Sequence, residues 1–181
     1  GSEMCIRDRE TMAQACYENP CKETTGAMLA IAKGAGIHGM LTGQVVDVYF
    51  EGKPIDKETL DFIHIHKTAA MIRGALEAGA RVGGASEEVV EKFGLAGEKI
   101  GVAFQILDDI LDVTSTMEEL GKPIHSDEKN EKTTYVTLYG IEESRKIAAK
   151  LSDEAVAIWK ELGESCDFLQ TLTNYLLQRT Y

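Results

Sequence analysis

The sequence predicts an all-α protein, and two observations support this prediction. Apolar residues recur with a period of about 3.6 residues over long stretches, as on one face of an amphipathic helix. The alternation of apolar and polar residues that marks a half-buried strand is nearly absent. No internal repeat, linker or low-complexity tract divides the chain. We therefore expect a single helical unit.

The first two expected helices have clear boundaries. One spans about residues 22–50 and ends before Gly52 and Pro54, because both residue types stop helices. Asp56 then supplies a side chain of the kind preferred at an N-cap. It begins a second helix over about residues 57–82, which ends at a pair of glycines.

A third helix and a long loop follow. Ser86 is the expected N-cap of a helix that reaches about residue 113, and two glutamates in its first turn favour the same start. The polar segment 114–132 is long for a loop in a compact domain, and such loops are usually functional. The remaining expected helices span about residues 134–138, 141–162 and 166–178.

Composition excludes several classes of protein. Of the 181 residues, 44% are hydrophobic and 27% are charged, which suits one soluble domain with a sizeable core. A net charge of −11 argues against nucleic acid or an anionic membrane as partner. No stretch approaches the roughly 18 consecutive apolar residues of a membrane span. Residues 1–4 lack the apolar core of a signal peptide, so we expect a cytoplasmic protein with reduced cysteines.

Four polar side chains share one face of the third helix. Gln105, Asp108, Asp109 and Asp112 lie at positions i, i+3, i+4 and i+7. Three carboxylates so placed repel one another, and apolar residues on the other sides place the helix in a core, so cations are needed. Oxygen ligands at this density suit Mg²⁺, which often bridges carboxylates to substrate phosphates. The alternative is an acidic face exposed to solvent.

Glycines extend this face toward the N-terminus of the third helix. Gly94, Gly97 and Gly101 each cost about 1 kcal/mol relative to alanine in a helix interior. They either allow close packing of another helix or leave a groove in which an extended apolar ligand could lie. The first helix repeats the pattern with three glycines and three larger side chains on one face: Gly36, Gly39, Gly43, Met40, Gln44 and Asp47.

Lysines offer binding sites for an anion. In the second helix Lys67 lies on a face of small and apolar residues, with Thr68 beside it. An ammonium group in that setting requires an anion, which could be the carboxylate of Asp47 or a phosphate oxygen. The polar loop adds further cations, among them Lys122 and Lys132.

Four segments, taken together, resemble the trans-type polyprenyl diphosphate synthase family, which includes farnesyl and geranylgeranyl diphosphate synthases. The resemblance covers about residue 11 to the C-terminus, with the segments in the family's order and spacing. They are a Gly-Gln-x-x-Asp helix in residues 39–47, Lys-Thr at 67–68, the second aspartate-rich motif at 104–112 and a lysine-bearing loop at 121–135. The fold implied is a helical bundle of the isoprenoid-synthase type.

The resemblance implies a prenyltransferase that condenses an allylic diphosphate with isopentenyl diphosphate. Asp108 would ligate Mg²⁺, and Asp109 and Asp112 would bind the metal directly or support its ligands. Catalytic roles are implied for Lys67, Thr68, Gln105 and Asp108. Contacts to the diphosphate are implied for Lys67, Gln105, Lys122 and Lys132, and supporting contacts for Gln44 and Asp47.

Other family motifs have no counterpart in this sequence. They are the first aspartate-rich motif and the residues that hold isopentenyl diphosphate. Residues 1–10 resemble no part of the family, and Gly1-Ser2 looks like a cloning remnant. We therefore expect residues 11–181 to be the C-terminal half of a prenyltransferase, truncated and inactive alone, that forms a homodimer or higher oligomer.

Two alternatives stay open. The chain could be a non-catalytic or regulatory half-subunit that completes its bundle with a partner chain. It could also be a helical interaction protein whose acidic helix is only solvated. Magnesium-dependent binding of a diphosphate would separate this last alternative from the others.

Overall fold

Every regular element in the described part of the chain is a helix, as predicted. The computed structural model describes residues 2–114 and 133–177. The first range contains α1 (Ser2–Glu18), α2 (Lys22–Ala35), α3 (Met40–Tyr49), α4 (Lys57–Ile63), η1 (His64–Ala69), α5 (Ala70–Val82) and α6 (Glu87–Thr114). The second contains α9 (Tyr135–Tyr139), α10 (Ile141–Leu162), η2 (Glu164–Cys166) and α11 (Asp167–Leu177).

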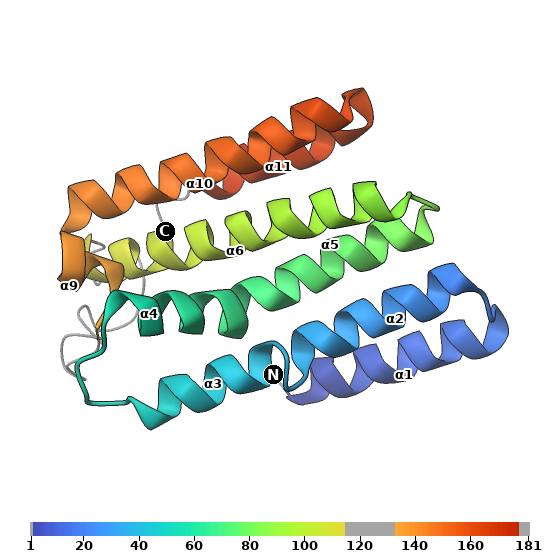
Figure 1. Cartoon of the computed structure of the whole chain (residues 1–181), viewed down its shortest axis with the longest axis horizontal. Coiled ribbons are helices and arrows are strands. Elements are labelled where there is room, and N and C mark those ends of the chain that lie inside the picture. The colour runs from blue at the N-terminus through green and yellow to red at the C-terminus, as the bar shows by residue number, and fades with distance from the viewer. Residues whose placement is uncertain (1, 115–132, 178–181) are drawn as a thin grey trace.

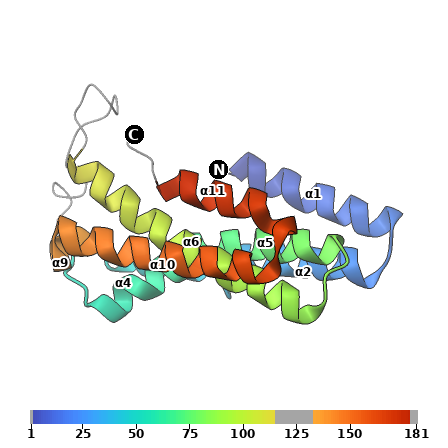
Figure 2. The same ribbon diagram turned by 90° about the horizontal axis from the view of Figure 1, so that it is seen from above.

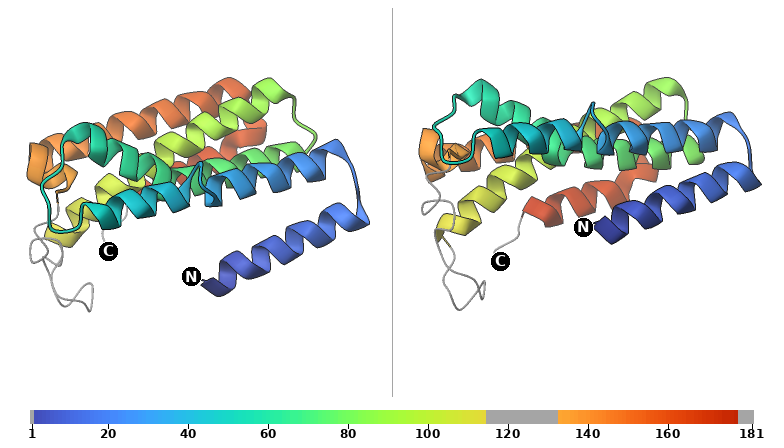
Figure 3. Two further views of the ribbon diagram at one scale, coloured as in Figure 1. Left: turned by 60° about the horizontal axis from the view of Figure 1, so that its bottom comes forward. Right: turned by 90° about the horizontal axis from the view of Figure 1, so that it is seen from below.

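The longer helices form one layer, with two helices on one side of it. Figure 1 shows α2 and α3, then α4 and α5, then α6, then α10 following one another across this layer. Turned by 90°, the molecule shows α1 and α11 on the same side of the layer (Figures 2 and 3). Helix α6 is central, because it packs against α5 and η1 on one side and α10 on the other.

The prediction of one helix over residues 22–50 is wrong. The chain forms α2 and α3 instead, with a break at residues 36–39. Gly36 has an extended backbone, and a Cβ placed on Gly39 would lie 2.2 Å from the carbonyl oxygen of Gly34. The chain therefore turns here through contacts that a larger residue at position 39 would prevent.

The second predicted helix is continuous but not uniform. Its α-helical ends, α4 and α5, are joined by the π-helical segment η1, which the 3.6-residue period does not anticipate. The N-cap prediction is confirmed, because the Asp56 side chain accepts a hydrogen bond of 2.8 Å from the backbone N–H of Thr59.

The other helices agree with prediction within a few residues, except at the N-terminus. Helix α10 has the bounds expected, and α6 ends one residue beyond its expected end. Helix α1 was not among the expected elements, because its apolar residues form only a weak amphipathic pattern. The predicted loop 114–132 lies outside the described residues, apart from Thr114 at the end of α6.

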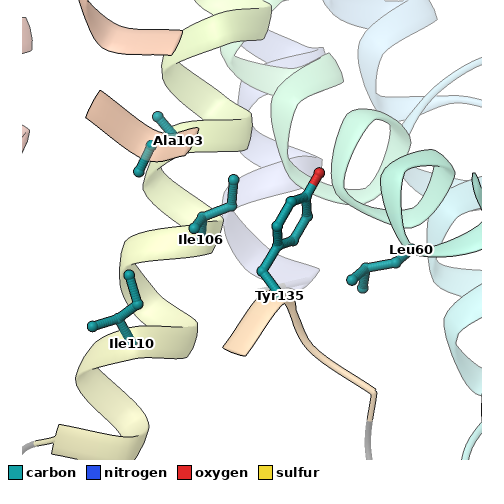
Figure 4. Packing of buried hydrophobic residues seen from close by; sticks show 6 residues of the cluster. Leu60, Ala103, Ile106, Ile110 and Tyr135 are labelled. Carbon is teal, nitrogen blue, oxygen red and sulfur yellow. The ribbon is translucent and has the colours of Figure 1, made fainter. Parts of the chain in front are cut away.

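The hydrophobic core lies along both sides of α6. At its C-terminal end Ile106 and Ile110 pack with Leu60 and Tyr135, and Figure 4 shows the tyrosine ring between Ile106 and Leu60. Nearer its N-terminal end α6 contributes to a second cluster with Trp159 of α10, which is 1% exposed. No helix in the described ranges has the length and apolar character needed to span a bilayer.

Candidate functional site

A polar cavity of about 230 Å³ brings together residues from several elements. Its walls come from the C-terminal end of α3 and the segment after it, from α4 and η1, from α6, and from Thr133 and Thr134 before α9. Six predicted site residues line it: Gln44, Asp47, Lys67, Thr68, Gln105 and Asp109. Residues from three predicted motifs, far apart in sequence, therefore meet in one place.

The π-helical segment η1 carries Lys67 and Thr68. A π-turn adds one residue to a helical turn and changes the direction of the side chains, and such turns often occur at functional sites. Helix α3 crosses η1 closely at Gly43, where an added Cβ would lie 2.2 Å from the backbone nitrogen of Lys67. Glycine at this position thus lets Gln44 and Asp47 approach the same cavity as Lys67.

Lys67 and Asp47 form an ion pair between η1 and α3. The Lys67 Nζ lies 2.5 Å from the Asp47 Oδ2, and the two side chains are 33% and 16% exposed. Two anions were expected as possible partners of the Lys67 ammonium group, and the structure shows one of them, the Asp47 carboxylate. Lys67 also lines the cavity. A contact between its ammonium group and a phosphate oxygen in that cavity stays a prediction.

Thr68 and Gln105 connect η1 to α6. The Thr68 hydroxyl donates a hydrogen bond of 3.1 Å to the Gln105 side-chain oxygen. The amide nitrogen of Gln105 donates in turn to Asp109 Oδ1, one helical turn further along, at 3.5 Å. The amide orientation of Gln105 is therefore set from both ends, and oxygen dipoles of Thr68 and Gln105 lie at the wall of the cavity.

Asp109 is the buried carboxylate of the site. Its side chain is 7% exposed, and its Oδ2 receives the backbone N–H of Tyr135 at 3.5 Å. The Nε2 of His64, in η1, lies 3.9 Å from the same oxygen. Contacts from α6, η1 and α9 thus hold this carboxylate at the cavity wall.

The three aspartates of α6 occupy different environments. Asp108 is exposed, Asp112 is buried like Asp109, and neither Asp108 nor Asp112 lines the cavity. Among the described residues no three His, Cys, Asp or Glu side chains converge as a metal site. The donor set still fits Mg²⁺ chemically, since carboxylate oxygens are its preferred protein ligands and Asp108 is open to solvent.

Two predicted diphosphate contacts, Lys122 and Lys132, lie in residues 115–132, outside the described residues. The described neighbours of this segment are α6, which carries the aspartates, and Thr133, whose hydroxyl receives the backbone N–H of Ile55 at 3.2 Å. Thr133 itself lines the cavity.

The glycines of α6 pack against neighbouring helices, so the alternative of an apolar groove is wrong. Gly94, Gly97 and Gly101 are all buried. A Cβ on Gly101 would lie 2.5 Å from the Cα of Ala69, and one on Gly97 would lie 3.0 Å from the Cα of Arg73. These glycines allow α6 to approach η1 and α5 closely.

His64 was missed as a cavity residue, and Tyr135 and Asp61 were missed as residues behind the cavity wall. The Tyr135 hydroxyl donates a hydrogen bond to Asp61 Oδ1, and its ring stacks on His64 with 5.5 Å between ring centres. Burial, and then the hydrogen bond to Asp61, raise the pKa of the Tyr135 phenol above its usual value. His64 precedes Lys67 by three residues, so the helical period could have placed it near the same face.

Comparison with known proteins identifies one family. The family model described as polyprenyl synthetase matches residues 11–166. A chloroplastic geranylgeranyl pyrophosphate synthase of Catharanthus roseus is 45% identical over 151 residues, which are 82% of this chain and 42% of that protein. A dimethylallyltranstransferase of Fischerella ambigua is 41% identical over 152 residues, 83% of this chain and 44% of that protein.

Solved structures agree with these relatives. The crystal structure of geranyltransferase from Helicobacter pylori, complexed with magnesium and isoprenyl diphosphate, matches with a TM-score of 0.80 and 34% sequence identity. The match covers 98% of this chain and 57% of that one. The chain thus spans less than half the length of the two curated relatives and somewhat more than half of this structure.

Proposed function

This chain belongs to the polyprenyl synthetase family, and from this premise we propose that it supplies the part of a prenyltransferase that binds an allylic diphosphate. The observation that carries the proposal is the cavity shared by Lys67, Thr68, Gln105 and Asp109. It places an ammonium group, two neutral oxygen dipoles and a carboxylate around one space, as the ionisation of an allylic diphosphate requires.

The proposed reaction is a condensation with isopentenyl diphosphate. The bond between the allylic carbon and its diphosphate oxygen breaks, and the electron pair leaves with the diphosphate. The double bond of isopentenyl diphosphate then forms the new carbon–carbon bond, and a proton is lost to restore a double bond. The product is one isoprene unit longer, and the by-products are inorganic diphosphate and a proton.

Lys67 is proposed to bind the leaving diphosphate. Its ammonium group would pass from Asp47 to a diphosphate oxygen, while Lys122 and Lys132 contribute further positive charge. Asp47 would support the position of Lys67 from α3 through their ion pair, which directs the ammonium group along the cavity wall before substrate binds, and Gln44 lines the same wall.

Thr68 and Gln105 are proposed to face the reacting carbon. Their hydrogen bond fixes the Gln105 side-chain oxygen, so its dipole needs no reorganisation when positive charge develops nearby. The Gln105 amide is held by Asp109 as well, which favours a single orientation.

Magnesium is proposed to be held by Asp108, with Asp109 and Asp112 as further ligands or supports. When bound, Mg²⁺ neutralises the negative charge of a diphosphate, which explains how a chain with a net charge of −11 can bind one. Support comes from the oxygen donors of α6 and from the related geranyltransferase, which was solved with magnesium.

Calorimetry with inorganic pyrophosphate tests the binding proposal. We expect heat of binding only in the presence of Mg²⁺, and its loss in Asp108→Asn. Asp153→Asn, at an exposed position of α10, is the matched control and should bind like the unchanged chain. If the unchanged chain binds no pyrophosphate with Mg²⁺ present, the acidic face of α6 is only solvated and the proposal fails.

An isopentenyl transfer assay tests whether this chain needs another segment. We expect no transfer by the chain alone, and transfer by a chimera that joins it to the N-terminal part of Helicobacter pylori geranyltransferase. Asp108→Asn in the chimera should abolish transfer. A chimera that folds and binds pyrophosphate without transfer would instead favour a non-catalytic or regulatory half-subunit.

We further propose that the chain associates with a second copy through α3. Leu41, Val45 and Val48 follow one another at helical spacing on α3 and are 49–60% exposed, and Ile37, in the turn before α3, is 67% exposed. An apolar stripe of this kind is typical of an interface with another protein.

A cytoplasmic location stays a prediction, since the Catharanthus relative is chloroplastic.

A further inference from the structure

Tyr135 contacts two carboxylates on two other elements. Its backbone N–H donates to Asp109 Oδ2 on α6 at 3.5 Å, and its hydroxyl donates to Asp61 Oδ1 on α4. The ring lies between these ends, 4% exposed, and packs with Leu60 and Ile106 (Figure 4). One residue at the start of α9 thus links the cavity carboxylate to α4.

We propose that Tyr135 and Asp61 form a positioning pair that fixes the orientation of Asp109 and, through it, the Gln105 amide. The inference rests on the proposed function, in which Gln105 faces the reacting carbon. Neither Tyr135 nor Asp61 lines the cavity, so both act through other residues.

The length of α9 is the first reason for this proposal. It has 5 residues, and a helix so short has too little internal stability to hold its own position. Its place beside Asp109 must therefore come from tertiary contacts. The Tyr135 hydroxyl supplies a directional contact, because Asp61 is itself held by an ion pair with Lys57 one turn earlier in α4.

The chain of hydrogen bonds from Asp61 is the second reason. It runs from Asp61 to Tyr135, from the Tyr135 backbone to Asp109, and from Asp109 to Gln105 and Thr68. The Tyr135 hydroxyl donates to Asp61 from a side chain that is buried between the helices. Loss of its hydroxyl should loosen Asp109 and broaden the orientations of the Gln105 amide.

Tyr135→Phe is the decisive variant, because it removes the hydroxyl and keeps the ring. Tyr139→Phe, one turn further along the same helix and 38% exposed, is the matched control. The first measurement is the NMR signal of the Gln105 side-chain amide in the ligand-free chain. We expect Tyr135→Phe to shift or broaden this signal and Tyr139→Phe to leave it unchanged.

The second measurement is magnesium-dependent affinity for pyrophosphate. The loss of one hydrogen bond to a carboxylate should weaken binding about three- to ten-fold in Tyr135→Phe. Asp61→Leu should weaken it as much, and the double variant no further, because both changes remove one interaction. Asp61→Asn keeps an oxygen that can accept the phenol and should restore part of the affinity.

The two measurements separate the possible failures. An unchanged Gln105 signal in Tyr135→Phe overturns the positioning role, whatever the chain binds. A lower unfolding temperature with unchanged pyrophosphate affinity also overturns it, since it leaves Tyr135 a structural role only. If the unchanged chain binds no pyrophosphate but the Gln105 signal shifts as expected, the proposed function fails and the positioning of Gln105 stands.

Discussion

At the level of single residues, the three aspartates of α6 differ in what surrounds them. Asp108 is exposed, whereas Asp109 is held by contacts from three elements. A carboxylate open to solvent is accessible to a cation, while one held on several sides orients its neighbours. The same residue type, repeated in one motif, is thus suited to two tasks.

The ion pair of Lys67 with Asp47 leads to a prediction about stability. Lys67→Met keeps most of the side-chain packing but leaves the largely buried Asp47 carboxylate without its lysine. We expect the free energy of unfolding to fall by about 1–2 kcal/mol in urea titrations at pH 7. Asp47→Asn added to Lys67→Met should recover part of this loss. Simple additivity of the two single changes would show that the residues are not coupled.

At the level of elements, the crossing of α3 and η1 depends on the absence of a side chain at Gly43. A Cβ there would meet the backbone of His66 and Lys67, which cannot move without moving η1 itself. The contact that forms the cavity wall therefore depends on close backbone packing as much as on the charged residues.

Two glycine-to-alanine variants test this dependence, because one is expected to lower the stability of the chain and the other to raise it. Gly43→Ala should destabilise the chain by about 2 kcal/mol or more, as overpacking against backbone does. Gly79→Ala, in α5 with no atom within 4 Å of an added Cβ, should stabilise it by about 0.5–1 kcal/mol. Thermal unfolding measures both. If the two variants changed stability alike, the crossing would not be as close as described.

The contribution of the contact between α6 and α10 to the stability of the fold should depend on pH. Lys99 on α6 forms an ion pair with Glu154 on α10, and the hydrogen bond from Lys99 lowers the pKa of Glu154 below its ordinary 4.5. A lowered pKa in the folded state stabilises the fold above about pH 4.5, and this contribution is lost as the pH falls through the lowered value.

Glu154→Gln should therefore lower stability more at pH 7 than at pH 3. We expect a loss of only a few tenths of a kcal/mol at pH 7, because the glutamate is 39% exposed. Thermal unfolding at both pH values measures the difference, with Asp153→Asn as the control on the same helix. A loss of equal size at pH 3 would mean that the effect of Glu154 is not electrostatic.

At the level of the whole molecule, the helices bury their apolar faces unevenly. Helix α6 is enclosed between α5, η1 and α10, whereas α3 leaves a row of large apolar side chains in contact with solvent. Exposed apolar area of this kind favours association, because burying it removes the area from water.

Association through α3 is expected to be visible by sedimentation velocity. The unchanged chain should sediment as a dimer or larger species at micromolar concentration, and Leu41→Glu combined with Val45→Lys should sediment as a monomer. Phe168→Lys, at an apolar position of α11 that is 75% exposed, should leave association unchanged. A monodisperse monomer of the unchanged chain would contradict the proposed interface.

Much of the fold could be predicted from periodicity and capping. The 3.6-residue pattern identified α6 and α10, and the Asp56 cap identified the start of α4, because these signals depend on neighbours within one or two turns. Helix α1 and the division between α2 and α3 were missed. The first has a weak pattern, and the second depends on a backbone contact between Gly34 and Gly39.

By itself the sequence determined the helical class, the motif residues and the family to which they belong. Only the tertiary structure decided that Lys67 pairs with Asp47, that the α6 glycines pack against α5 and η1, and that Tyr135 reaches both Asp109 and Asp61. The physical reason is the separation in sequence between the residues that interact. Helix formation and capping are set by residues a few positions apart, whereas ion pairs and close backbone contacts depend on where distant elements meet.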